Sequence, residues 1–248
     1  LAYARPIPWA IIHIGERSRN ARLVPKDSKL AARQVRFNDF RKMWREVFSP
    51  ALGAFQALKE EHIPWVTLTD DALAQSLAPD SRLLILPWPE ELNTQQQKTV
   101  ERFEKQGGYV IRINPAAGWH TKSGKSGLVK NLRRIIRQQS GSAPIQIDSP
   151  ERMHTVCYHN PNTKRYTVCL ANTWGWFRST RVPDPKLNQG TEPLPCTGVA
   201  IKFSKSIGQP KKVFEVLSGK QLIIKPSDND VQVQIPEFQI MACVVAEY

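Results

Sequence analysis

In the first part of the chain, short continuous apolar runs predict buried parallel strands, because both faces of such strands are covered. These runs lie at 9–14, 65–68, 82–86 and 109–113. Between them, apolar residues recur every three or four positions, which predicts amphipathic helices. The helical segments lie at 37–62, 70–77, 94–105 and 128–139. Strands that alternate with helices predict right-handed crossovers and one parallel sheet.

Local signals refine two of these helices. Pro50 lies inside the first helical segment, and we expect it to kink or split that helix because proline removes a backbone donor. The spacing from Thr94 to Gln97 is that of a capping box, which opens a helix. Gly107 and Gly108 are expected to end the same helix.

After residues 140–144 the helical spacing disappears, and short alternating stretches separated by turn residues predict antiparallel strands. These strands are expected at 153–158, 165–171, 199–203, 211–217, 221–225, 231–235 and 240–246. A segment with four prolines, 177–197, is a long irregular insertion. The pattern therefore predicts an α/β domain with a doubly wound parallel sheet over 1–142 and an antiparallel β-sandwich over 143–248.

The net charge of +13 is concentrated in two segments. Residues 16–45 carry ten basic and three acidic residues, and residues 120–139 carry six basic residues and no acidic one. Such segments favour solvated helix faces or a surface that meets an acidic partner domain over a nucleic-acid groove, for which no motif is present. No run approaches the roughly 18 apolar residues of a membrane span, so no membrane partner is expected.

The four cysteines, Cys157, Cys169, Cys196 and Cys243, lack the C-x-x-C spacing of metal sites, so no metal is expected. Cys157 and Cys169 are expected to face each other across a hairpin. A disulfide between them and two small buried hydrophobic side chains both fit this hairpin. Because both interpretations stand, the cellular compartment stays open between cytoplasmic and extracytoplasmic.

Several stretches carry a resemblance to a known family. In the first part they are Ile12-His-Ile-Gly-Glu-Arg-Ser-Arg19, Leu52 to Leu58, Leu83 to Pro87, Thr94 to Gln97 and Phe103 to Gly108. In this order they resemble the α/β domain that follows the catalytic barrel in β-galactosidases of the trimerising type and in related glycosidases. That domain belongs to the flavodoxin-like, class I glutamine-amidotransferase-like group. In the second part, 144–148, 166–172, 231–236 and 244–247 resemble the C-terminal β-sandwich of the same enzymes.

The resemblance implies a non-catalytic accessory or oligomerisation region of a larger glycoside-hydrolase-like protein. The two carboxylates that such enzymes use on a sugar lie in the barrel, which this chain omits, and the start at Leu1 looks cut from something longer. The implied partners are an upstream catalytic domain or neighbouring subunits of a homo-oligomer. The insertion 177–197 and the basic helix after Gly127 depart from the family pattern.

Tests for a catalytic or cofactor site fail on the residues. An active amidotransferase-like domain needs a cysteine at the sharp turn after a central strand. Here the turn is Leu86-Pro-Trp-Pro-Glu90, and no cysteine precedes Cys157. The P-loop-like Gly124-Lys-Ser126 lacks the required earlier glycine, so no nucleotide cofactor is expected. His13, on a buried strand, is interpreted as a core histidine. We therefore predict no catalytic residue and no cofactor.

Candidate ligand contacts are aromatic. Trp119 and His120 follow a predicted strand's carboxyl end, where open α/β sheets bind ligands, and Trp174 and Trp176 with Asn172 suit stacking on a sugar ring. An aromatic cluster that fills a core or an interdomain seam is the competing interpretation. A stand-alone carbohydrate-binding module is the alternative function, and a nucleotide or nucleic-acid binder is a third.

Overall fold

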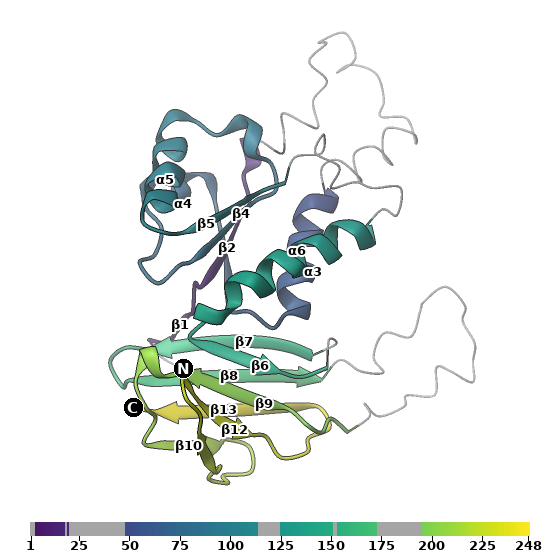
Figure 1. Ribbon diagram of the computed structural model, residues 1–248, viewed down its shortest axis with the longest axis vertical. Coiled ribbons are helices and arrows are strands. Elements are labelled where there is room, and N and C mark those ends of the chain that lie inside the picture. Colours follow the sequence, from purple (N-terminus) through teal and green to yellow (C-terminus); the bar gives the residue numbers. More distant parts are fainter. Residues whose placement is uncertain (1–2, 18, 20–47, 114–124, 151–152, 173–194) are drawn as a thin grey trace, which may run out of the picture. The chain divides into compact units, whose positions relative to one another are not determined.

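A computed structural model describes residues 3–17, 19, 48–113, 125–150, 153–172 and 195–248 (Figure 1). They form two compact units. The α/β unit comprises residues 8–58 and 65–141, and the β unit comprises residues 1–7, 59–64 and 142–248. Among the helices within these described ranges, none combines the length and apolar character needed to cross a membrane.

The α/β unit is built on a four-stranded parallel sheet in the order β3-β2-β4-β5. The strands are β2 (Ala10–His13), β3 (Trp65–Leu68), β4 (Leu83–Leu86) and β5 (Tyr109–Arg112). Every residue of β2 and β4 is buried, and all of these residues except His13 at the end of β2 are apolar, as strands covered on both faces require. Because β3 and β4 lie on opposite sides of β2, the connections leave β2 and β4 in opposite directions, which creates a crevice at their carboxyl ends.

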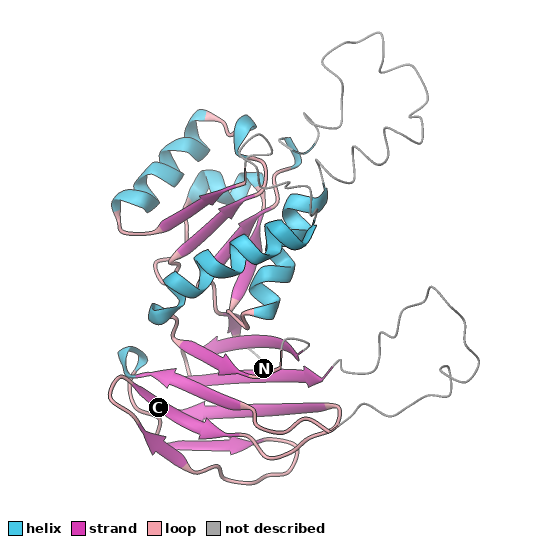
Figure 2. Cartoon of the chain, turned by 45° about the vertical axis from the view of Figure 1, so that its right-hand side comes forward, coloured by secondary structure: helices cyan, strands magenta, loops and turns pink. Residues whose placement is uncertain are grey.

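Helices cover both faces of this sheet (Figures 1 and 2). They are α3 (Ser49–Glu60), α4 (Asp70–Gln75), α5 (Thr94–Lys105) and α6 (Lys125–Gln139), with a 3-10 turn η2 (Pro89–Glu91). On the face toward α4 and α5, Ile11 and Leu84 pack with Leu73, Val100 and Phe103. On α6 the buried residues are Leu128, Val129, Leu132 and Ile136, which lie on one side of the helix as an amphipathic helix requires.

The ends of α5 show how the sequence sets its length. Asn93 is the N-cap: its Oδ1 accepts from the Gln96 backbone N–H at 2.9 Å, and Gln96 Oε1 accepts from the Asn93 N–H at 2.8 Å. The capping box therefore starts one residue before the predicted Thr94, because asparagine supplies the acceptor. The predicted end is confirmed, since Gly107 has φ +86° and Gly108 N–H donates to the Phe103 carbonyl at 2.9 Å, a Schellman motif.

Two other helix predictions need comment. Pro50 is the second residue of α3, where proline removes no intrahelical hydrogen bond, and the kink or split expected at Pro50 stays a prediction. The part of the predicted helix at 37–47 lies outside the described residues. Helix α4 is shorter than predicted and ends at Gln75.

The β unit contains two antiparallel sheets (Figure 2). One has the order β1-β7-β8-β13-β10, and the other β11-β12-β9-β6. The strands of the first sheet are β1 (Arg5–Pro6), β7 (Met153–Asn160), β8 (Arg165–Asn172), β10 (Lys212–Glu215) and β13 (Met241–Glu247). Those of the second are β6 (Ile145–Asp148), β9 (Ala200–Ser204), β11 (Ile224–Pro226) and β12 (Asp230–Gln234). Two short 3-10 turns, η4 (Ser140–Ser142) and η5 (Lys205–Ile207), are also present.

Alternate residues of these strands form the core of the β unit, as the period of two predicts. Val168 and Val244 pair in register in the first sheet, and Phe203 and Val231 in the second; all four are fully buried. The structure thus combines a parallel α/β sheet with antiparallel sheets. It differs from the predicted 1–142 domain at the N-terminus, because Arg5 and Pro6 pair with β7 of the β unit.

The register of the β7–β8 hairpin corrects the predicted cysteine pairing. Cys157 pairs with Val168, whereas Cys169 pairs with Val156. Cys157 and Cys169 therefore point to opposite faces of the sheet. The prediction that they face each other is wrong, and so is a disulfide between them as an interpretation. Cys157 is a free, buried thiol, and burial raises its pKa to about 12, so it serves as a small hydrophobic side chain.

Candidate functional site

The carboxyl edge of the parallel sheet carries a hydrogen-bonded polar network. His13, the last residue of β2, makes a 3.0 Å hydrogen bond through Nε2 to Oδ1 of Asp70, the first residue of α4. Gln96 Nε2 donates to the same Asp70 Oδ1 at 2.9 Å and to the Asp70 carbonyl at 3.0 Å. The backbone N–H of Arg17 donates to Asp70 Oδ2 at 3.1 Å. The network joins the end of β2 to the first turns of α4 and α5.

The electrostatics of this network fix its protonation states. Burial lowers the pKa of the fully buried His13, against the raising effect of the Asp70 carboxylate. Burial alone raises the pKa of Asp70, but hydrogen bonds from the Arg17 N–H and the Gln96 amide, together with His13, hold that pKa below its ordinary value. At neutral pH the His13 imidazole is therefore neutral and donates its Nε2 proton to the ionised Asp70 carboxylate.

The histidine of this network is fully buried, whereas the Asp70 side chain keeps 26% of its surface exposed. A Cβ placed on Gly15 would lie 2.6 Å from His13 Cε1 and 3.1 Å from Asp70 Oδ1, so the backbone passes directly over the pair. His13 Nδ1 is buried and lies within hydrogen-bonding distance of no described group. A histidine acts as a general base on a nucleophile within about 3.2 Å, and here none of the described residues supplies one. The network links the end of β2 to the first turns of α4 and α5.

The exit of β4 is where an amidotransferase-like domain would carry its nucleophile. Trp88 occupies this turn, is only 2% exposed and is followed directly by η2, which starts at Pro89. A buried indole between two prolines therefore stands at the turn after β4. Across the described ranges, no group of three or more histidine, cysteine, aspartate or glutamate side chains is placed to hold a metal ion.

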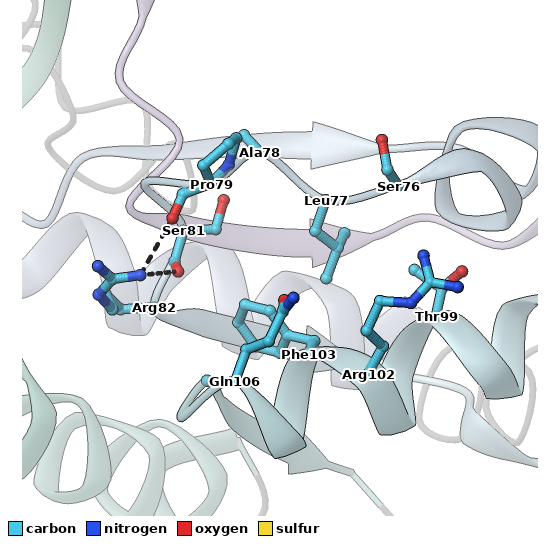
Figure 3. A pocket seen from close by; sticks show the side chains of 11 residues that line it. Ser76, Leu77, Ala78, Pro79, Ser81, Arg82, Thr99, Arg102, Phe103 and Gln106 are labelled. Carbon is cyan, nitrogen blue, oxygen red and sulfur yellow. Dashed lines mark hydrogen bonds between the residues drawn. The ribbon is translucent and has the colours of Figure 1, made fainter.

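A pocket of about 430 Å³ lies at the opposite, amino edge of the sheet, between α5 and the segment that joins α4 to β4 (Figure 3). Leu77 and Phe103 form its apolar part, with Arg82 toward one end and Arg102 toward the other. Arg82 Nη1 donates to the carbonyls of Pro79 and Ser81, both at 3.1 Å. No acidic residue lines the pocket, so its electrostatic character is cationic.

Ser81 is the unusual group in this pocket. Its residue is 2% exposed, and its hydroxyl has no hydrogen-bond partner among the described residues. A buried hydroxyl without a partner is unfavourable by about 1–3 kcal/mol.

The residues predicted as ligand contacts are not brought together by the described structure. Trp119, His120, Trp174 and Trp176 lie outside the described residues. Asn172 is the last residue of β8 and is buried. Its Nδ2 donates to the Gln239 carbonyl and its backbone N–H to the Ile240 carbonyl, each at 2.8 Å, so this side chain ties β8 to the segment before β13.

Sequence reasoning did not select Asp70, Gln96, Ser81 or Arg102. Asp70 carried a partial signal, since an acidic residue at the start of a helix after a parallel strand lies at the carboxyl edge of the sheet. Nothing in the local sequence distinguishes Ser81 or Arg102 from ordinary loop and helix-surface residues.

Comparisons with known proteins found solved structures with a similar fold. No protein-family model matches the sequence, and no curated protein matches it. Solved structures with a similar fold include alpha-L-fucosidase isoenzyme 2 from Paenibacillus thiaminolyticus, at a TM-score of 0.64 and 14% identity over 99% of this chain and 49% of that chain. They also include a catalytic mutant of a GH42 beta-galactosidase from G. stearothermophilus, at a TM-score of 0.54 and 8% identity over 98% of this chain and 41% of that chain. The chain therefore spans half or less of the length of these glycoside hydrolases.

Proposed function

We propose that this chain is a non-catalytic accessory region of a larger glycoside-hydrolase-like protein, in which it supports a carbohydrate-active catalytic domain. The observation that carries the proposal is the extent of the fold similarity. It covers 99% and 98% of this chain but only 49% and 41% of the two glycoside hydrolases, so an α/β unit and a β unit of this kind form one part of such enzymes.

In this proposal the α/β unit is a flavodoxin-like, amidotransferase-like domain that has a scaffold role. The strand order β3-β2-β4-β5 and the helices on both faces of the sheet suit such a domain. Its catalytic variant requires a thiolate, whereas the β4 exit holds the buried Trp88 and the first cysteine of the chain is Cys157.

The proposed role of the α/β unit is docking on a catalytic barrel or a neighbouring subunit, as in the trimerising relatives. Lys130, Arg134 and Arg137 of α6 are exposed and spaced by four and three residues, so they lie on one side of the helix. A cationic helix side of this kind favours association with an acidic surface and makes it sensitive to salt.

Two measurements test this proposal. Coding sequence upstream of the Leu1 codon should continue into a barrel with paired acidic residues, and a start codon at that position would contradict the accessory role. Light scattering on the protein encoded by the longer frame should show an oligomer that weakens in a Lys130→Glu, Arg134→Glu variant. Lys220→Glu, an exposed change in the β unit, is the control and should leave the mass unchanged.

A second candidate function is the binding of a small sugar acid in the amino-edge pocket, and the Arg102 guanidinium favours it. The pocket volume of about 430 Å³ suits a monosaccharide-sized ligand. The Arg102 guanidinium makes no ion pair with any described residue and would receive the carboxylate. Gln106 would receive a ring hydroxyl, with Phe103 beside the apolar part of the ligand.

Calorimetric titration with glucuronate tests this candidate, with glucose as the uncharged comparison. We expect glucuronate alone to bind, and an Arg102→Gln change to weaken binding by about tenfold or more, because a charge-assisted hydrogen bond is lost. Lys98→Gln, an exposed change on the same helix outside the pocket, should have no effect. Equal binding of glucose and glucuronate, or no binding of either, would remove this candidate.

Two further functions that the sequence suggested, a carbohydrate-binding module and a nucleic-acid binder, stay predictions. A carbohydrate-binding module that uses Trp174 and Trp176 would lose retention on polysaccharide affinity gels when these residues are changed to alanine. A nucleic-acid binder would bind DNA or RNA with an affinity that falls steeply as salt rises, and absence of binding at low salt would exclude that function.

A further inference from the structure

Two free cysteines face each other across the centre of the first sheet of the β unit. Cys169 of β8 and Cys243 of β13 are direct partners in the antiparallel register, and their Sγ atoms lie 3.4 Å apart. Both residues are partly exposed, and both belong to the face opposite the buried Val168 and Val244. The thiols are therefore in contact and accessible to small molecules.

The backbone at this position is of the type that allows a cross-strand bond. The Cys243 N–H donates to Glu215 Oε1 at 3.2 Å, and the Cys243 carbonyl accepts from the Val216 N–H at 2.7 Å. Both backbone groups of Cys243 therefore point away from β8, which makes Cys169 and Cys243 a non-hydrogen-bonded pair. The Cα atoms of such pairs are about 4.5 Å apart, a separation that disulfides span.

The two thiols differ in acidity, which assigns their roles. The hydrogen bond with Cys243 lowers the pKa of the Cys169 thiol to about 7. The pKa of Cys243 is raised by the same hydrogen bond, by burial and by the neighbouring charge of Glu215. Cys169 is consequently the better thiolate nucleophile near neutral pH, and Cys243 keeps its proton until Cys169 has reacted.

We infer that Cys169 and Cys243 form a reversible thiol–disulfide site whose oxidant is a low-molecular-weight disulfide such as glutathione disulfide. The Cys169 thiolate attacks one sulfur of the oxidant, forms a mixed disulfide and releases one glutathione thiolate. Cys243 then loses its proton to solvent and attacks the Cys169 sulfur, which releases the second glutathione. One glutathione disulfide is reduced to two thiols while the two cysteines are oxidised to one disulfide.

The other two cysteines are not placed to compete. Cys157 lies on the buried face of the same sheet, and Cys196 is buried with a pKa that burial raises. The proposed bond would join two adjacent strands 74 positions apart in sequence, which closes a large loop in the unfolded chain. The inference concerns the β unit alone and does not depend on the proposed function.

The test incubates the full chain with mixtures of oxidised and reduced glutathione, counts free thiols and maps disulfides by peptide mass analysis. We expect the free thiols to fall from four to two, with the peptides of Cys169 and Cys243 joined. We also expect the urea midpoint of the oxidised protein to rise and to return after reduction. Cys157→Ser is the control and should form the same bond.

The Cys243→Ser variant separates the two steps, because it should stop at a stable mixed disulfide on Cys169. Four titratable thiols at every glutathione ratio, or a disulfide mapped to another pair, would overturn the inference. So would a folded Cys243→Ser protein in which Cys169 takes up no glutathione. Mapping of the unmodified chain decides the question even where a serine variant fails to fold.

Discussion

At the scale of single residues, a buried polar network explains a histidine that sequence reasoning left as a core residue. The prediction that His13 is buried is confirmed, since it is fully buried. Its partner Asp70 lies 57 positions further along the chain, and Gln96, which binds the same Asp70 carboxylate, lies 83 positions further, so only the fold brings the three residues together. Distant pairings of this kind leave almost no local signal, which is why the network was not predicted.

Removal of the Asp70 carboxylate should destabilise the α/β unit. We expect Asp70→Ala to lower the free energy of unfolding by about 1–3 kcal/mol, because it leaves the buried His13 Nε2 without an acceptor and leaves Gln96 Nε2 only the main-chain carbonyl of residue 70. Asp71→Ala is the matched control, since Asp71 is also an acid of the first turn of α4 but is exposed. Urea unfolding measures both changes, and equal losses would show that the network contributes nothing beyond the helix dipole.

The same network predicts a pH dependence. The folded pKa of His13 lies below its ordinary value of 6.5, so as the pH falls below about 6.5 the unfolded chain binds a proton first and stability decreases. The depressed pKa of Asp70 adds a further loss in stronger acid, because the unfolded carboxyl is protonated before the folded one. Urea midpoints from about pH 7 to about pH 5 should fall in the wild type and fall less in His13→Gln. An unchanged slope in that variant would contradict this origin.

At the scale of elements, most strands and helices could be predicted because their signals are local. The runs that form β2 and β4 are apolar except for His13, since both faces are covered, and α5 carries its own start and stop residues. The cap of α5 was displaced by one residue because Asn93 and Thr94 are both capping residues, and only geometry separates them. The cysteine pairing failed because adjacent positions on a strand point to opposite faces.

The end of α5 offers a test at this scale. Gly107 has φ +86°, a conformation that costs about 1–2 kcal/mol for a residue with a side chain. Gly107→Ala should therefore lower the free energy of unfolding by about 1 kcal/mol. Gly141→Ala, at an exposed position where a Cβ meets nothing within 4 Å, is the control. Thermal unfolding that ranks the two variants in the reverse order would contradict the assignment of the motif.

At the scale of the whole molecule, the sequence indicated an α/β part followed by a β part, and the structure contains both kinds of sheet. Its N-terminal residues were assigned to the first part, but β1 belongs to the β unit. Strand β1 has two residues, too few for any periodic pattern to predict. The amino-edge pocket was equally beyond prediction, because it arises where α5 packs beside a loop and no motif marks it.

The central proposal is that this chain carries no catalytic centre of its own. The most direct measurement incubates the purified 248-residue chain with a panel of aryl glycosides and follows release of the aryl group. The account predicts hydrolysis at the rate of buffer alone, for the wild type and for His13→Gln and Asp70→Asn. Turnover by the wild type that disappears in one of these variants, while its circular dichroism stays unchanged, would contradict the account.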